Sequence, residues 1–136
     1  MLFRSGTPNC EVAELKNWRG AKIGVVRDDA AVKELLSAGV PQSSLDYAPT
    51  SEDNYRKLAA KRIDCIADME TSMIWGYSHY GLGAAPKRYG RVSVGSAFYF
   101  AMNIKSDEVR AKALQAAIDA MRAEGSFEVI AAKYLK

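Results

Sequence analysis

The sequence predicts a three-layer α/β fold in which a parallel, Rossmann-like sheet lies between helices, with two further helices at the C-terminal end. Three consecutive strand-and-helix units carry this prediction, because such alternation requires right-handed crossovers and a parallel sheet. We expect their strands near residues 22–26, 45–48 and 63–67. A chain of 136 residues, 49% of them hydrophobic, has room for one core of ordinary size.

The first unit is the stretch AKIGVVRDDA, residues 21–30. Its apolar run IGVV suits a central strand that is buried on both faces, and three charged residues, Arg27–Asp29, then interrupt it. The aspartates are suitable caps for the helix that follows, which we expect to end before Gly39. Ligands of doubly wound sheets bind at junctions of this kind.

The second and third units repeat the pattern. A short strand is expected at residues 45–48, and Ser51 is a natural cap for the helix after it. The third strand, Ile63 to Ala67, contains Cys65, which we interpret as an inert thiol of the core. Thr71 or Ser72 is expected to cap the third helix.

Polar residues follow both the first and the third strand. If these two strands are neighbours in the sheet, their carboxyl ends bring the polar residues together at one rim. Such a mixed-charge rim suits a cationic or zwitterionic solute, although the aspartates after the first strand also serve as helix caps. The predicted ligand-binding residues are Arg27, Asp28, Asp29, Asp68, Glu70, Thr71 and Ser72.

The C-terminal part of the sequence predicts one long strand and two helices. Apolar residues alternate from Arg91 to Ile104, with a slip near Gly95 where the strand is expected to bend. A helix capped by Ser106 then runs to about residue 124, and a second one begins after Gly125. Each helix carries an apolar stripe, formed by Leu114, Ala117, Ile118 and Met121 in the first and by Phe127, Ile130, Ala131, Tyr134 and Leu135 in the second.

Composition argues against several classes of protein. The 19 basic and 16 acidic residues are spread along the chain, so nucleic acid is not an expected partner. The two cysteines, Cys10 and Cys65, and the single His79 have no metal-binding spacing, so no cofactor is expected. No nucleophile-and-base set indicates an enzyme, and no window is apolar enough for insertion into a membrane. The helically spaced aromatics Trp75, Tyr77 and Tyr80 are interpreted as packing.

Several segments resemble one family when read in order. The runs ELKNWRGAKIGVV and RIDCIADM, and the closing segment YFAMNIKSDEVRAKALQAAIDAMRAEGSFEVIAAKYLK, are similar to the C-terminal half of type 2 periplasmic solute-binding proteins of amino-acid transporters. The resemblance implies a single solute-binding-protein-like domain over residues 1–136, with the first lobe missing. It assigns residues 15–90 to the second lobe, 91–104 to a strand crossing between lobes, and 105–136 to the terminal helices.

The resemblance also implies a function, although the family's ligand residues transfer poorly. Members of the family hold a ligand carboxylate with a Gly-Thr pair after the first strand of lobe 2, where this chain has Asp29-Ala30-Ala31. Their aspartate for an amino group corresponds to Met69, which Asp68 and Glu70 flank. The function implied is non-catalytic binding of a small amino-acid-like or cationic solute for transport or sensing. The location implied is periplasmic, or cytoplasmic if Met1 is the native start, because no signal peptide precedes the first strand.

Two alternatives remain open from the sequence. The chain can be an oligomeric interaction module that keeps the fold without a solute, and the apolar stripes of the last two helices then predict a homodimer through the C-terminal segment. A receiver-like phosphoacceptor domain would also place aspartates such as Asp28, Asp29 and Asp68 after these strands to hold Mg²⁺. The Lys-Pro of that class is missing from this sequence.

Overall fold

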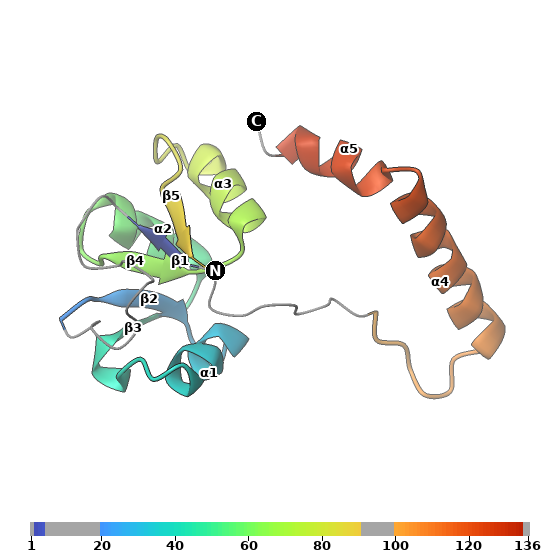
Figure 1. Ribbon diagram of the computed structural model, residues 1–136, viewed down its shortest axis with the longest axis horizontal. Coiled ribbons are helices and arrows are strands. Elements are labelled where there is room, and N and C mark those ends of the chain that lie inside the picture. The colour runs from blue at the N-terminus through green and yellow to red at the C-terminus, as the bar shows by residue number, and fades with distance from the viewer. Residues whose placement is uncertain (1, 5–19, 91–99, 135–136) are drawn as a thin grey trace. The chain divides into compact units, whose positions relative to one another are not determined.

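The computed structural model of the protein describes residues 2–4, 20–90 and 100–134 (Figure 1). The chain divides into two units, Met1–Val94 and Gly95–Lys136. Among the described residues, the first unit holds the sheet and the helices α1 to α3, and the second holds α4 and α5. The prediction that all 136 residues form one solute-binding domain stays a prediction.

The predicted α/β fold is confirmed by the sheet of the first unit. Its strands are β1 (Leu2–Arg4), β2 (Ile23–Val26), β3 (Leu45–Ala48), β4 (Cys65–Ala67) and β5 (Lys87–Gly90). They lie in the order β3-β2-β4-β1-β5. The three predicted strands pair in parallel, with β2 between β3 and β4, whereas β1 runs antiparallel to both β4 and β5.

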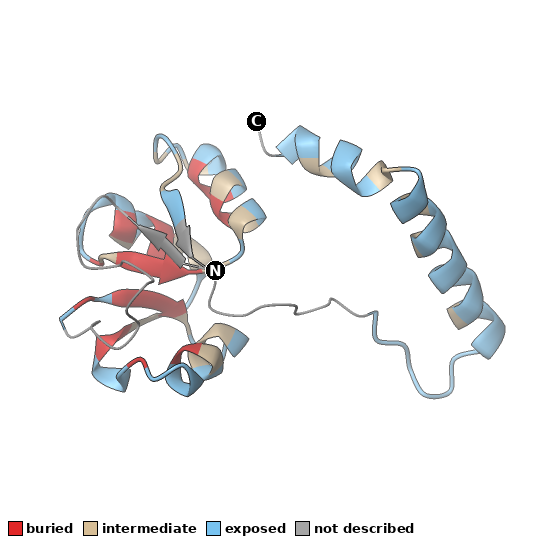
Figure 2. Ribbon diagram, in the orientation of Figure 1, coloured by how far each residue is buried: buried red, intermediate tan, exposed pale blue. Residues whose placement is uncertain are grey.

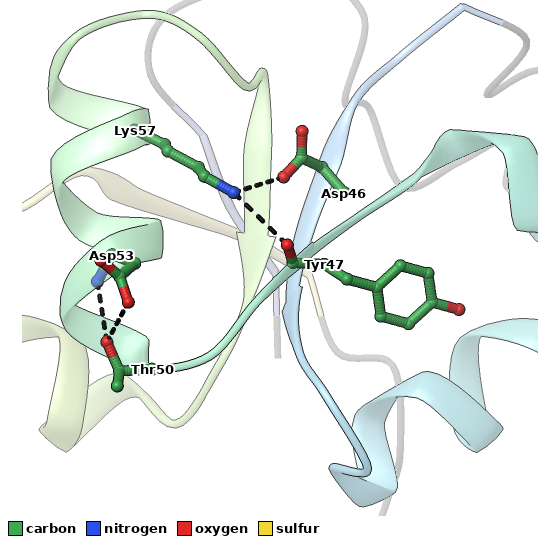
Figure 3. A network of polar contacts seen from close by, with 5 residues as sticks. All are labelled: Asp46, Tyr47, Thr50, Asp53 and Lys57. Carbon is green, nitrogen blue, oxygen red and sulfur yellow. Dashed lines mark hydrogen bonds and ion pairs between the residues drawn. The ribbon is translucent and has the colours of Figure 1, made fainter.

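The helices begin close to the predicted positions, but the caps of α2, α3 and α4 differ from those predicted. Their bounds are α1 (Ala30–Ser37), α2 (Ser51–Ala59), α3 (Glu70–His79), α4 (Glu108–Ala123) and α5 (Ser126–Tyr134), and a 3-10 turn occupies Gln42–Ser44. Thr50, not Ser51, caps α2: its backbone is extended, and its Oγ1 accepts from the Asp53 amide at 3.1 Å and donates to Asp53 Oδ2 at 2.6 Å (Figure 3). Asp107, not Ser106, caps α4: its Oδ1 accepts from the Val109 amide at 2.9 Å.

Two apolar clusters cover the two faces of the sheet, which gives the predicted three layers (Figure 2). Side chains alternate along a strand, so Ile23 and Val25 of β2 join Leu35 of α1 on one face. Gly24 faces the opposite side, where a Cβ would lie 2.8 Å from Asn54 Oδ1 of α2. Cys65 is fully buried, as predicted for a core thiol.

The outer strand β3 is joined to α2 by an ion pair. Lys57 of α2 lies 2.6 Å from Asp46 Oδ1 and donates to the Tyr47 carbonyl oxygen at 3.5 Å (Figure 3).

The segment after the sheet differs from the prediction. The strand that completes the sheet, β5, lies before Arg91 and begins directly after Gly81, Gly83 and Pro86, which the sequence predicts as a glycine-rich connection. Residues 100–104 form no strand, and the remainder of the predicted crossing strand, 91–99, lies outside the described residues, as does Cys10. Phe100 and Ile104, two apolar residues of the predicted strand, are 73% and 98% exposed.

Candidate functional site

Three helices begin at one edge of the sheet, where the parallel strands β2, β3 and β4 end. The β2–β4 ladder pairs Ile23 with Cys65 and Gly24 with Ile66, so the two strands run side by side in the same direction. Arg27–Asp29 leaves β2 at this edge, and Asp68–Ser72 leaves β4. We call these eight residues the rim. The adjacency of the first and third predicted strands is therefore confirmed, and it is what brings the two segments of the rim to the same edge.

On the β2 side, Asp29 acts as the predicted helix cap. Its Oδ1 accepts from the Ala31 amide at 2.8 Å, at the start of α1. Asp28 has φ of 60°, a left-handed conformation that favours glycine, and its side chain is exposed. Arg27 is exposed and, among the residues that the structure describes, makes no ion pair with Asp68 or with its neighbours.

On the β4 side, both oxygens of the Asp68 carboxylate accept a hydrogen bond. The Tyr55 hydroxyl donates to Oδ2 at 2.7 Å, and the Met69 amide donates to Oδ1 at 2.7 Å. Burial, assisted by the hydrogen bond and the negative charge of Asp68, raises the pKa of the Tyr55 phenol far above its ordinary value. The phenol is therefore a hydrogen-bond donor at every physiological pH.

The first turn of α3 forms the rest of the rim. Met69 occupies the cap position and makes no side-chain cap hydrogen bond, so the expectation that Thr71 or Ser72 caps this helix is wrong. Both lie inside the first turn, Thr71 exposed and Ser72 half-buried. Glu70 Oε2 accepts from the Arg88 guanidinium of β5 at 2.9 Å.

The charges at this edge favour a positively charged group. The edge carries four carboxylates, from Asp28, Asp29, Asp68 and Glu70, and two guanidinium groups, from Arg27 and Arg88, of which Arg88 pairs with Glu70. Several carboxylates with half-buried or exposed side chains suit an ammonium or guanidinium donor. No group of three or more His, Cys, Asp or Glu side chains in the described part of the chain is arranged to hold a metal ion.

Sequence reasoning missed two residues of this site. Tyr55 has the spacing of a core residue on α2, and nothing in the sequence shows that its hydroxyl reaches Asp68. Arg88 follows a glycine-rich connection and belongs to no sequence motif. Of the three aromatics predicted to pack, Tyr77 is buried, but Trp75 is 40% exposed and stacks on His79 with ring centroids 4.3 Å apart.

Comparisons with known proteins place the chain by its fold. No protein-family model matches the sequence, and no curated protein matches it. Among solved structures it is similar to a histidine kinase sensor domain that itself resembles periplasmic binding proteins (TM-score 0.69, 24% identity). It is also similar to the second substrate-binding domain of Lactococcus lactis GlnP (0.67, 17%) and to an ancestral arginine-binding protein bound to arginine (0.66, 17%).

These similarities confirm the periplasmic-binding-protein-like fold that the sequence indicated. The matches cover 98–99% of this chain and 56–58% of the matched chains, so the chain spans a little over half their length. The three matched proteins are sensor and binding domains. Among the described residues, none of the helices is long and apolar enough to cross a membrane.

Proposed function

We propose that the protein is a non-catalytic binding domain that takes a small amino-acid-like or cationic solute at the rim, for transport or sensing. The observation that carries the proposal is the juxtaposition of Arg27–Asp29 and Asp68–Ser72 at the carboxyl ends of two neighbouring parallel strands. The excess of carboxylates at that edge favours a cationic solute. The solved structures with this fold include one bound to arginine, which makes L-arginine the first compound to test.

A thermal-shift comparison of matched compounds tests the proposal. L-arginine has a guanidinium side chain and putrescine has two ammonium groups. L-citrulline has nearly the shape of arginine without the guanidinium charge, and the side chain of L-glutamine is also neutral. A ligand at about 100 times its Kd stabilises the folded state by about 2.7 kcal/mol, which raises the melting temperature by several degrees. We expect a saturable rise with arginine or putrescine and a smaller one with citrulline; flat curves for all four compounds contradict solute binding of this class.

Variants at the rim locate the bound compound. Asp68→Ala removes a carboxylate that we place in contact with the solute, so the increase in melting temperature on adding the compound should be smaller or absent. Asp119→Ala, which removes an exposed carboxylate of α4 in the other unit, is the control for net charge and should leave the rise unchanged. An unchanged rise in Asp68→Ala contradicts this placement.

A second function, assembly through the C-terminal unit, is favoured by a different observation. Neither α4 nor α5 contains a buried residue, and their larger apolar side chains include Phe127 and Ile130, each 42% exposed. We propose that this apolar surface is covered by a second copy of the chain, because exposed apolar patches usually mark interaction sites. Light scattering that gives about twice 14.9 kDa supports the homodimer, whereas the monomer mass contradicts it. Ile130→Asp should then dissociate the pair, while Ala132→Asp, on another side of α5, should not.

A further inference from the structure

One hydrogen bond connects the core of the first unit to the rim. Tyr55 belongs to the cluster between α2, α3 and the sheet and is only 3% exposed. Its hydroxyl donates to Oδ2 of Asp68, a half-buried residue at the end of β4. The orientation of the Asp68 carboxylate therefore depends on a side chain that solvent scarcely reaches.

The ring of Tyr55 has little freedom to move. It packs so closely on Gly76 of α3 that a Cβ at that position would clash with ring atoms Cε2 and Cδ2. The rings of Tyr77 and Tyr80 lie 5.9 and 6.4 Å away, centroid to centroid, and the Tyr77 hydroxyl donates to the Tyr55 carbonyl oxygen at 3.4 Å. The packing of α2 against α3 therefore sets the position of the Tyr55 hydroxyl.

The Asp68 carboxylate keeps acceptor capacity on both oxygens. Each oxygen of an ionised carboxylate can accept about two hydrogen bonds, and here Tyr55 and the Met69 amide each provide one. Within the described part of the chain no other donor contacts this carboxylate, so one acceptor position remains on each oxygen. Two such positions side by side match the paired N–H groups of a guanidinium, or the N–H groups of an ammonium.

We propose that Tyr55 is a positioning residue, which holds the Asp68 carboxylate in one orientation for an ammonium or guanidinium group of the solute. This inference rests on the proposed solute binding at the rim. Fixing a binding group before the ligand arrives raises affinity, because the entropy of ordering that group is not lost on binding. The simpler interpretation is that Asp68 only satisfies a buried hydroxyl, in which case removing the hydroxyl changes stability and leaves binding unaltered.

Two matched substitutions in the full-length chain separate these interpretations. Tyr55→Phe removes the hydroxyl and keeps the ring, and Tyr77→Phe does the same at a buried neighbour whose hydroxyl does not contact Asp68. With L-arginine as the calorimetric probe, we expect Tyr55→Phe to raise Kd about tenfold and Tyr77→Phe to change it less than about twofold. In an Asp68→Ala background, Tyr55→Phe should have no further effect. Equal arginine affinity in wild type and Tyr55→Phe overturns the inference and leaves the proposed function intact.

A second measurement can overturn the inference without any ligand. The side-chain carboxyl carbon of Asp68 gives a ¹³C NMR resonance that can be identified by its loss in Asp68→Asn. We expect this resonance to move in Tyr55→Phe and to stay in place in Tyr77→Phe. If the wild-type protein binds no arginine, the proposed arginine binding is wrong, but the NMR comparison still tests whether Tyr55 holds the Asp68 carboxylate. An unmoved Asp68 resonance in Tyr55→Phe then overturns the inference.

Discussion

Replacing Gly76 with alanine tests the packing that supports the rim, because two effects of opposite sign compete there. Gly76 lies inside α3, where alanine is favoured over glycine by about 1 kcal/mol from helix propensity alone. Against this, the new Cβ would clash with Tyr55 Cε2 and lie 2.7 Å from Cδ2 and 3.2 Å from Cζ. Distances under 3 Å require the ring to move, and overpacking of a core typically costs about 1–3 kcal/mol.

The hydrogen bond of the displaced ring adds to that cost. Moving Tyr55 breaks its 2.7 Å contact with Asp68, and a hydrogen bond to a charged group contributes about 1.5–3 kcal/mol. We therefore expect Gly76→Ala to lower the free energy of unfolding by about 1.5–5 kcal/mol, after the propensity gain is subtracted. Denaturant unfolding followed by circular dichroism measures this difference, and Ser78→Ala, at an exposed position of the same helix, should change it by less than about 0.5 kcal/mol.

A double substitution identifies the cause of the loss. In a Tyr55→Leu background the smaller side chain leaves room for the Cβ, so Gly76→Ala should become neutral or stabilising. If Gly76→Ala in the wild-type background stabilises the protein by about 1 kcal/mol, as helix propensity alone predicts, the described contact between Gly76 and Tyr55 is wrong.

Three further predictions concern stability. Asp28→Gly should raise the free energy of unfolding by about 0.5–1 kcal/mol in denaturant unfolding, because glycine adopts φ of 60° without strain. Lys61→Gly, a control away from the rim with φ of 57°, should give a similar gain. A loss of stability in Asp28→Gly alone would mean that the Asp28 side chain makes a stabilising contact. Thr50→Ala should lower the free energy of unfolding by about 1 kcal/mol through loss of the α2 cap, and an unchanged denaturation midpoint would contradict that role. Burial raises the pKa of Tyr77 to about 12 from 10.0, so the folded state retains protons that the unfolded state has lost, and the melting temperature should fall between about pH 10 and pH 12. Tyr77→Phe should make that fall shallower, and an identical pH profile in this variant would contradict the shift.

The fold could be predicted because local patterns agreed with the final packing. The apolar run IGVV became the central strand β2, and Asp29 caps α1 as its position suggested. The predicted caps failed where several hydroxyl residues stand together, because backbone conformation decides among neighbours: Thr50 is extended, and Ser51 is already helical. The strand prediction was wrong for residues 100–104, because alternating apolar residues such as Phe100 and Ile104 favour a strand without requiring one.

The candidate site could be predicted in part. The residues after β2 and β4 were found because parallel strands place their carboxyl ends together, which depends only on strand order. Tyr55 and Arg88 were missed because their polar atoms reach the rim from elements that the sequence assigns to core and connection. A contact made by the tip of a long side chain has no periodic signal in a sequence.

Mapping of bound L-arginine by NMR tests the central claim, solute binding at the rim, most directly. Amide resonances of the ¹⁵N-labelled protein are followed while arginine is added, with L-citrulline added to a second sample. We predict saturable shifts centred on Arg27–Asp29 and Asp68–Ser72, with a smaller response to citrulline. Saturable shifts centred on another part of the chain, or no shifts at millimolar arginine, would contradict the account.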